Sequence, residues 1–366
     1  MTAYLILEDG TIYEGESFGS SKTTICELVF TTGMAGYVEA ISDPSYGAQG
    51  VVMTFPEMGN HGVMTADMEA AHPALSALIV HSHHEMPTDD RQELTLEAWL
   101  KKEGVAGISG IDTRALTRKL RTKGTMRGMI TTTAPKDIAQ VLGEIRNWQM
   151  PPQVPLVAIQ EKQFFPKTGS GIGDQLHIAV IDYGTKQNMI RDLTNLGANI
   201  TLYPPTAKLE DIQADNCDGI LLSNGPGDPK DCPDQIREIR RFIEADIPMM
   251  AICLGHQMVA LAVGLDTEKM HFGHRGGNHA VRDCKTQKLY TTSQNHGYVV
   301  IKADLSKADF AVEIGFEHVT DGSIEGLIFK DKPVRTYQFH PEASPGPEDT
   351  FYLFEAFCQR IKSEYI

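Results

Sequence analysis

The residues best suited to nucleophilic chemistry lie in the stretch Met249-Met-Ala-Ile-Cys253-Leu-Gly-His-Gln257. An apolar run short enough for a buried parallel strand ends at Cys253, and a run compatible with a helix follows it, which predicts that the sulfur lies at a strand-to-helix corner. Ala251 and Gly255 are small, as the pinched backbone of such a corner requires. The helix dipole would favour the thiolate. Taken alone, a cysteine that ends an apolar strand is more often a small buried hydrophobe.

A thiolate nucleophile needs a base, and the base needs a group that orients it. His340 and Glu342 follow an apolar run and flank a single proline. Side chains two positions apart in an extended segment point to the same side, so the carboxylate can accept from the imidazole while the other ring nitrogen faces the sulfur. These residues predict a triad of Cys253, His340 and Glu342. The alternative for the pair alone is a surface histidine beside an unrelated glutamate.

Acyl transfer also requires two backbone N–H donors for the oxyanion, one after the nucleophile and one from a glycine-rich loop. Leu254 fits the first part, and Gly225 in Ser223-Asn-Gly-Pro-Gly-Asp-Pro229 fits the second. Glycine at 225 and at 227 allows the loop to approach a substrate closely. A phosphate cradle is the other interpretation of this loop, and the missing P-loop lysine weakens it.

The elements that must position these residues alternate between strand and helix in the C-terminal half. This alternation predicts an α/β sheet with right-handed crossovers, in which ligands collect at the carboxyl ends of the strands. Asp182, the 223–229 loop and Cys253 all fall at such ends. We expect strands at 177–182, 199–203, 219–223, 249–253, 325–329 and 334–339, helices at 186–196, 235–244 and 350–361, and added β structure between about 264 and 298.

The N-terminal half reads as β-rich. Residues 1–30 alternate apolar and polar side chains around Glu8-Asp9-Gly10, which predicts a hairpin that opens a half-open sheet. Further strands are expected at 49–56 and 75–80, and helices at 95–102 and from Asp112 or Thr113 to Gly124. The second of these helices is the most basic element of the chain, and it is either a solvated face or a docking surface for an acidic partner. Its cations are Arg114, Arg118, Lys119, Arg121 and Lys123.

Composition limits the classes of protein to consider. The 366 residues fit two domains, which we place at 1–150 and 177–366, with a proline- and glycine-rich linker at 151–176. A net charge of −15 argues against binding to nucleic acid. With no bilayer-length apolar run, no leader and six scattered cysteines, we expect a cytoplasmic protein with reduced thiols and no membrane contact. The His81-Ser-His83-His84 cluster fits a solvated loop better than a metal site, because apart from Glu85 it has no further ligand group at a suitable spacing.

Four motifs in the C-terminal half together resemble the class I (triad) glutamine amidotransferases: Cys253-Leu-Gly-His-Gln257, Ser223-Asn-Gly-Pro-Gly-Asp-Pro229, Asn295-His-Gly-Tyr298 and His340-Pro-Glu342. The N-terminal half narrows this resemblance. Its motifs are similar to those of the small, glutamine-hydrolysing subunit of carbamoyl-phosphate synthase, so that the resemblance covers nearly the whole chain. These motifs are Thr32-Gly-Met-Ala-Gly-Tyr37, Asp43-Pro-Ser-Tyr46 and Gly110-Ile-Asp-Thr-Arg114.

The resemblance implies that Cys253 is the nucleophile, that His340 is the general base and then the acid, and that Glu342 orients the histidine. It assigns the oxyanion donors to Leu254 and Gly225. The positions implied to contact L-glutamine are Ser45, Gly227, Gln257, Asn295, Gly297 and Tyr298, of which Ser45 comes from the N-terminal domain. Position 298 is often phenylalanine in the family, and because that contact is largely main-chain we expect little effect of the tyrosine.

The implied reaction is hydrolysis of glutamine through a γ-glutamyl thioester, with the ammonia passed to a large subunit that joins it to bicarbonate using two ATP. ATP and Mg are therefore expected in the large subunit, and no cofactor or metal is expected in this chain, which has no ATP motif. One alternative is a stand-alone cysteine hydrolase acting on γ-glutamyl compounds, which would not need the N-terminal half. Another is an inactive regulatory paralogue, which would lack a triad member. Whether the product serves arginine or pyrimidine synthesis stays open.

Overall fold

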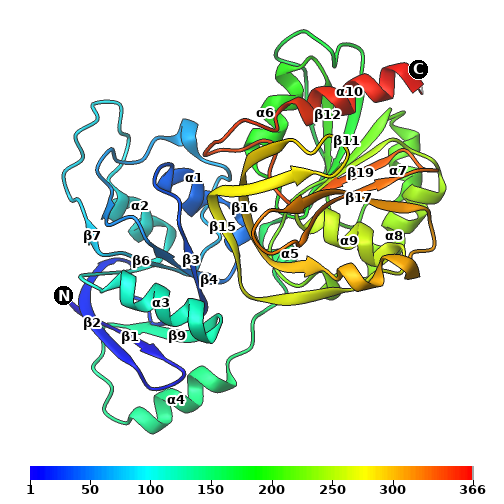
Figure 1. Cartoon of the computed structure of the whole chain (residues 1–366). Helices are drawn as coiled ribbons and strands as arrows, with labels where there is room; N and C mark the ends of the chain where they lie inside the picture. Colours follow the sequence, from blue (N-terminus) through cyan, green and yellow to red (C-terminus); the bar gives the residue numbers. More distant parts are fainter. Residues whose placement is uncertain (365–366) are drawn as a thin grey trace. The chain divides into compact units, whose positions relative to one another are not determined.

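The computed structural model describes residues 1–364, and the chain divides into two compact units, one of residues 1–153 and one that begins at Val154. The first unit is built on a closed barrel of seven strands in the order β1-β2-β8-β6-β4-β3-β9 (Figure 1). The strands are β1 (Thr2–Leu7), β2 (Ile12–Gly19), β3 (Thr24–Thr31), β4 (Gln49–Met53), β6 (Ala77–Ile79), β8 (Ala106–Ser109) and β9 (Met126–Thr131).

Closure of this barrel corrects the prediction of a half-open sheet. The expected hairpin of β1 and β2 is present, with Leu5 opposite Tyr13. The closing strand is β9, which pairs antiparallel with both β1 and β3 and so leaves neither with a free edge. The sequence analysis identified no strand there because Arg127 and Gly128 interrupt its apolar pattern, and glycine is depleted in strands.

The helices of the first unit begin and end at recognisable capping residues. Asp112 caps α3 (Thr113–Lys123) by accepting from the Ala115 N–H at 2.8 Å, and Gly124 closes it, as predicted. Thr95 caps α2 in the same way. The other elements are α1 (Tyr37–Ser42), α2 (Leu96–Glu103), α4 (Ile138–Asn147), the 3-10 helices η1 (Pro44–Tyr46) and η2 (Thr65–Asp67), and the paired strands β5 (Glu57–Met58) and β7 (Ser82–His83).

The second unit contains one mixed sheet of ten strands in the order β10-β12-β11-β13-β14-β19-β18-β17-β15-β16. Strands β12, β11, β13, β14 and β19 are parallel, and the other pairings are antiparallel. The strands are β10 (Gln163–Phe165), β11 (His177–Ile181), β12 (Asn199–Tyr203), β13 (Gly219–Leu222), β14 (Met249–Ile252), β15 (Thr267–Asp283), β16 (Leu289–Val300), β17 (Val312–His318), β18 (Ile324–Phe329) and β19 (Val334–Tyr337).

Helices cover both faces of this sheet, as the alternating pattern predicted. Successive residues of β11 enter different cores: Ile178 packs with α6 and α10, whereas Ala179 packs with α7, α8 and α9. The mixed α/β class is therefore confirmed. The helices are α5 (Val154–Val157), α6 (Gln187–Asn195), α7 (Leu209–Ala214), α8 (Pro233–Glu244), α9 (Leu254–Ala262), α10 (Tyr352–Glu364) and the 3-10 helices η3 (Pro229–Asp231) and η4 (Lys302–Lys307).

Two short elements lie in the segment predicted to be a linker. Helix α5 opens the second unit, and β10 pairs antiparallel with β12 at the edge of the ten-stranded sheet. Three residues between prolines and glycines are too few for a periodic signal, so the sequence could not reveal β10. Among the described residues, no helix has the length and apolar character needed to cross a bilayer.

Candidate active site

Cys253 lies at the predicted strand-to-helix corner, between β14 and α9. Its backbone has φ 53° and ψ −105°, a conformation that L side chains rarely adopt and that concentrates at functional sites. A hydrogen bond of 2.8 Å from the Cys253 N–H to the Tyr337 carbonyl oxygen holds the corner to β19. Glycine is required at 255, because a Cβ there would lie 2.6 Å from the Leu222 carbonyl oxygen.

The structure brings the three triad candidates together in a buried cluster. Nδ1 of His340 lies 2.6 Å from Oε1 of Glu342, and both residues are 2 % exposed. Burial alone would lower the pKa of His340, but the charges of Glu342 and of the Cys253 sulfur raise it to about 10. The imidazole is therefore held in its protonated form against the Glu342 carboxylate with the Cys253 sulfur near it, and its Nε2 makes no hydrogen bond among the described residues. An oriented imidazole beside a sulfur is what a cysteine nucleophile requires.

Lys186 is a member of this cluster that the sequence analysis missed. Its side chain is 3 % exposed, and its Nζ lies 3.3 Å from Oε1 of Glu342 and 2.8 Å from the Ser344 carbonyl oxygen. Although burial opposes ionisation, the charges of His340 and Lys186 lower the pKa of Glu342. Lys186 therefore keeps the carboxylate ionised where it orients His340.

The two predicted oxyanion donors lie against each other. A Cβ at Gly225 would approach Cδ2 of Leu254 to 2.8 Å and the Tyr183 carbonyl oxygen to 2.3 Å, so only glycine fits the loop this close to α9. Among the residues that the structure describes, neither the Gly225 N–H nor the Leu254 N–H donates a hydrogen bond. Both remain available to an oxyanion.

The strand β16 carries three of the predicted glutamine contacts, at Asn295, Gly297 and Tyr298. The sulfur of Cys253 lies 3.6 Å from the Asn295 carbonyl oxygen. The side-chain nitrogen of Gln257 donates to the Tyr298 carbonyl oxygen at 2.9 Å, so residue 298 uses its main chain there, and its ring type is not involved. These predicted residues therefore lie along one strand beside Cys253.

Two other predicted positions lie on loops. Gly227 has φ 98°, which favours glycine, in the loop after β13. Ser45 belongs to the first unit, where it lies in η1 and its N–H donates to Oδ1 of Asp43 at 2.9 Å.

Comparison with known proteins agrees with both halves of the sequence analysis. Residues 5–130 match the family described as carbamoyl-phosphate synthase small chain, CPSase domain, and residues 179–360 match glutamine amidotransferase class-I. The carbamoyl phosphate synthase small chain of Bacillus caldolyticus is 44% identical over 99% of this chain and 97% of its own length. The chain belongs to the carbamoyl-phosphate synthase small chain family.

Other members of this small-chain family are similarly close. The small chain of Clostridium perfringens (strain 13 / Type A) is 42% identical over 98% of this chain and 99% of its own length. The pyrimidine-specific small chain of Bacillus subtilis (strain 168) is 41% identical over 99% of this chain and 97% of its own length. The likeness thus extends over both units, and this confirms the resemblance seen in the motifs.

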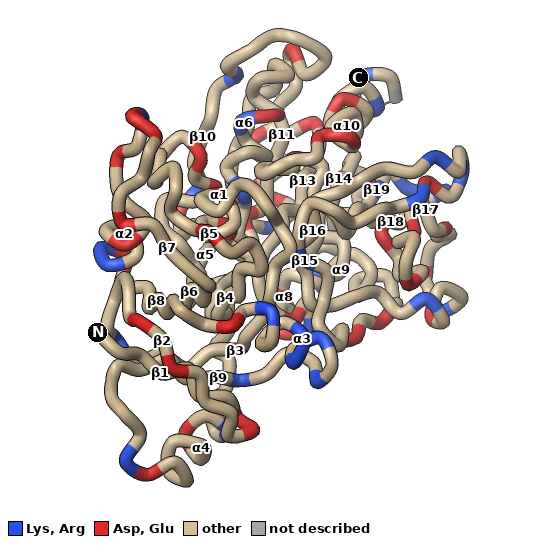
Figure 2. The backbone as a smooth tube through the Cα atoms, turned by 60° about the vertical axis from the view of Figure 1, so that its left-hand side comes forward, with Lys and Arg blue, Asp and Glu red and all other residues tan. Residues whose placement is uncertain are grey.

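Helix α3 of this small-chain family member presents a row of exposed cations. Arg114, Arg118, Arg121 and Lys123 have no ion-pair partner among residues 1–364, whereas Lys119 lies 2.7 Å from Asp9. Figure 2 shows the blue segments gathered along α3. An unpaired basic face in an acidic chain fits the docking alternative better than the solvated one.

The three histidines of the His81-Ser-His83-His84 cluster each contact a different partner. His81 lies 3.2 Å from the Ile111 carbonyl oxygen, His84 pairs with Glu57 at 2.6 Å, and His83 stacks on a phenylalanine ring. His83 has two carboxylates near it, those of Glu85 and Glu97, and of these three residues only Glu85 is exposed. The cluster therefore has the character of a surface loop. All six cysteines are free thiols, as expected.

Proposed function

We propose that this chain is the glutamine-hydrolysing subunit of a carbamoyl-phosphate synthase and that Cys253 is its nucleophile. The observation that carries this proposal is the buried cluster in which Glu342 holds His340 at 2.6 Å with the Cys253 sulfur near the same imidazole. An inactive paralogue would lack a member of this cluster. A thiolate beside an oriented imidazolium can attack an amide and then protonate the departing nitrogen.

In the first half-reaction, the Cys253 thiolate attacks the side-chain amide carbon of glutamine. The carbonyl oxygen becomes an oxyanion, which the N–H groups of Leu254 and Gly225 stabilise. His340 then donates its proton to the amide nitrogen, the C–N bond breaks, and ammonia leaves. The product is a γ-glutamyl thioester on Cys253.

In the second half-reaction, water attacks the thioester. The now neutral His340 removes a proton from the water as the new C–O bond forms, and the C–S bond breaks to restore the thiolate. Glutamate leaves. Lys186 and Glu342 keep the imidazole oriented in both halves.

The glutamine contacts in this proposal are Ser45, Gly227, Gln257, Asn295, Gly297 and Tyr298. Ammonia is delivered to a large subunit that makes carbamoyl phosphate from bicarbonate and two ATP, and the large subunit provides the ATP and Mg sites. Such a chain works in the cytoplasm beside its partner. The family likeness over both units supports the partnership, because a stand-alone γ-glutamyl hydrolase would not need the first unit.

Replacement of Cys253 by serine in the reconstituted complex tests the proposal. Cys253→Ser should abolish glutamine-dependent formation of carbamoyl phosphate, because a hydroxyl is a far poorer nucleophile than a thiolate. Added ammonium should restore the rate close to that of the wild type given the same salt. An assembled mutant complex that ammonium fails to rescue would contradict the assigned division of labour. Retained glutamine-dependent synthesis would contradict the role of Cys253.

The exposed cations of α3 belong to the same proposal as the docking surface for an acidic face of the large subunit. Replacing Arg118 and Arg121 by glutamate should slow association by about tenfold at low salt, with a smaller difference at high salt. The matched control is replacement of Lys101 and Lys102 by glutamate, since these lysines are exposed on α2 of the same unit and give the same change in charge. Equal association rates for the two variants would return α3 to a solvated role.

A further inference from the structure

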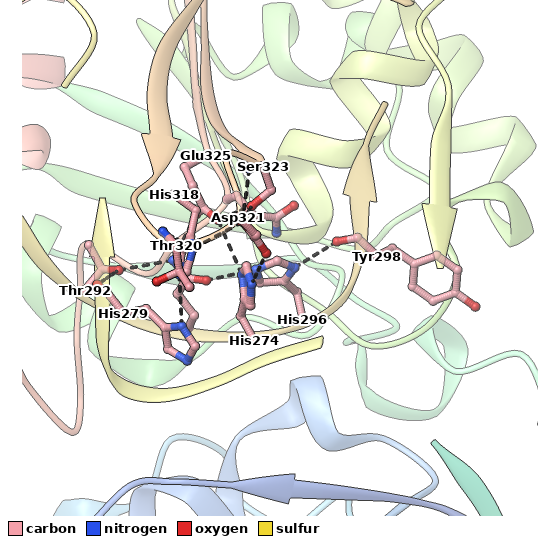
Figure 3. A network of polar contacts seen from close by, with 12 residues as sticks. His274, His279, Thr292, His296, Tyr298, His318, Thr320, Asp321, Ser323 and Glu325 are labelled. Carbon is pink, nitrogen blue, oxygen red and sulfur yellow. Dashed lines mark hydrogen bonds and ion pairs between the residues drawn. The ribbon is translucent and has the colours of Figure 1, made fainter. Parts of the chain in front are cut away.

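A second buried cluster of ionisable side chains, separate from the triad residues, lies at the antiparallel end of the ten-stranded sheet (Figure 3). Its members come from β15, β16, β17, β18 and the turn between β17 and β18. They are His274, His279, His296, His318, Asp321 and Glu325. None of them has a part in the reaction described above.

The inner part of this cluster contains more hydrogen-bond acceptors than donors. Nδ1 of His296 lies 2.8 Å from the Tyr298 carbonyl oxygen, so this nitrogen carries the hydrogen. Nε2 of His296 then carries a lone pair instead of a hydrogen. This nitrogen lies 3.0 Å from Oε1 of Gln294, which also carries lone pairs. A proton on both nitrogens would bury an imidazolium against two neutral oxygens, which is costly.

Rotation of the Gln294 amide does not remove this conflict. Its nitrogen now donates to Oε2 of Glu325 at 2.9 Å, and the rotated amide would place its oxygen against that carboxylate instead. Glu325 is completely buried, and its Oε1 lies 3.6 Å from Nδ1 of His274, which makes no hydrogen bond within residues 1–364. Several lone pairs therefore converge, and they require a positive species among them, which is either a proton or a metal ion.

We propose that His274, His296 and Glu325 bind a divalent transition-metal ion of the zinc class through Nδ1, Nε2 and a carboxylate oxygen. One ligand atom from each of the three residues lies within 4.8 Å of the others, and all three residues are buried. Two imidazoles and one carboxylate are a donor set that zinc accepts. The sequence analysis expected no metal in this chain, because these ligands are spread over more than fifty positions and no short motif unites them.

The partners of the outer nitrogens have the pattern found around metal-bound histidines. Nε2 of His274 lies 2.9 Å from Oδ2 of Asp321, and Nδ1 of His296 lies 2.8 Å from the Tyr298 carbonyl oxygen. A carboxylate or carbonyl on the far nitrogen fixes the tautomer and turns the near nitrogen inward as a ligand. A cavity of about 560 Å³ lined by His274, Asp321 and Ser323 provides an entry path.

A second histidine trio, His274 with His279 and His318, fits a metal less well. The rings of His274 and His318 are stacked, with centroids 4.1 Å apart and planes inclined by 19°. Lone pairs in nearly parallel planes cannot meet at one ion. The rings of His274 and His296, by contrast, are inclined by 87° at 5.1 Å, which allows both to point at a shared ion.

Zinc titration of the full chain, prepared without a polyhistidine tag and stripped with EDTA, tests this site. A chromophoric chelator serves as the competitor, and Cys253→Ala is the background because a reactive thiolate also binds zinc. We expect one equivalent to bind, with an X-ray absorption spectrum that shows nitrogen and oxygen ligands. No bound equivalent would overturn the proposal and leave a proton as the positive species, and so would sulfur ligation.

Variants locate the ion among the histidines. Asp321→Asn should weaken zinc binding by about 10- to 100-fold, and since the Asp321 side chain is 42% exposed its loss should not disturb folding. Glu325→Gln, checked by circular dichroism, should weaken it by more. The matched control His271→Gln lies on the same strand but is exposed, and it should bind zinc as the background does. Loss of binding in His279→Gln with retention in Glu325→Gln would place the ion in the other trio and refute the assignment. Because the readout is metal binding, failure here leaves the glutaminase proposal untouched.

Discussion

Two buried histidines of the second unit each face a carboxylate, and the two sites differ in what lies at the far side of the ring. In the first, His340 pairs with Glu342, and the Cys253 sulfur interacts with the same imidazole. In the second, His274 pairs with Asp321 at 2.9 Å, and its other nitrogen faces the carboxylate of Glu325. In the proposed function the sulfur beside the first histidine is the nucleophile, whereas the second carboxylate beside the other histidine makes that cluster a site for positive charge.

A third grouping, Cys217 with His177, shows that a histidine next to a cysteine is not sufficient to make the sulfur reactive. The sulfur of Cys217 lies 3.9 Å from both ring nitrogens of His177. Burial raises the pKa of Cys217 to about 11, so it stays a thiol at neutral pH. His177 is bonded to the Thr201 hydroxyl at 2.8 Å and not to a carboxylate. Cys253 differs by its place at a helix N-terminus and by an oriented imidazolium.

Labelling with a glutamine-analogue diazo-ketone tests whether Cys253 differs in reactivity from Cys217 and the other cysteines. The expected result is all-or-none. We expect modification of Cys253 alone among the six cysteines, because its sulfur lies at a helix N-terminus near a protonated histidine. Peptide mass mapping after digestion identifies the labelled residue. Excess glutamine should protect it, and label found on Cys217 or Cys284 would show that proximity to histidine or exposure decides reactivity.

Replacement of one histidine from each cluster should distinguish the triad from the second cluster. His340→Asn should reduce glutaminase activity by about 10⁴-fold or more, since it removes the proton carrier of both half-reactions. His279→Gln, in the other cluster, should have a much smaller effect. Steady-state ammonia release measures both variants. Comparable losses would mean that the second cluster takes part in catalysis and would break the distinction drawn here.

Replacement of the carboxylate should cost less than replacement of the base. Glu342→Gln keeps the shape of the side chain but cannot hold the imidazolium by charge, so its loss of kcat should be about 100-fold smaller than that of His340→Asn. KM for glutamine should change little, because Glu342 does not face the substrate. Equal losses from both variants would count against the roles assigned to them.

The sequence predicted the triad because each member sits at the end of an apolar strand, and strand ends meet at one edge of a parallel sheet. Lys186 was missed because it begins a helix, and no pattern pairs it with residues over 150 positions away. A signal did exist. A positive charge at the start of a helix interacts unfavourably with the helix dipole, so a lysine there indicates that an anion lies nearby.

The histidine cluster could not have been found in the same way. Its register depends on irregularities in β15, where the pairing with β16 shifts between Lys269 and His274 and again between Gly276 and His279. A one-residue shift in strand register reverses which side chains face inward. Which of these histidines are buried can therefore be known only once the pairing of the strands is known. The closure of the barrel by β9 escaped prediction for a similar reason, since pairing across more than a hundred residues leaves no local trace.

The smallest expected effect concerns the cation that distinguishes the triad from the second cluster. Removing one partner of a buried ion pair costs about 3–5 kcal/mol, so Lys186→Met should lower the stability of the second unit by that amount. Lys167→Met is the matched control, because Lys167 pairs with Asp174 at 2.9 Å on the surface, and its loss should cost no more than about 1 kcal/mol. Glutaminase activity should fall in the first variant alone.

The two units can be followed separately in one urea titration. Both tryptophans, Trp99 and Trp148, lie in the first unit, so their fluorescence reports on that unit and should be unchanged in both variants. Thiol reactivity of the fully buried Cys358 reports on the second unit.

The pH dependence of stability gives a further test of Lys186. The charges of His340 and Lys186 lower the pKa of Glu342, so the contribution of Glu342 to stability is present above its ordinary pKa and is lost as pH falls. Without Lys186 this acid loss should begin at a higher pH. If Lys186→Met proves as harmless as Lys167→Met at every pH, the lysine does not hold the carboxylate ionised, and His340 alone must do so.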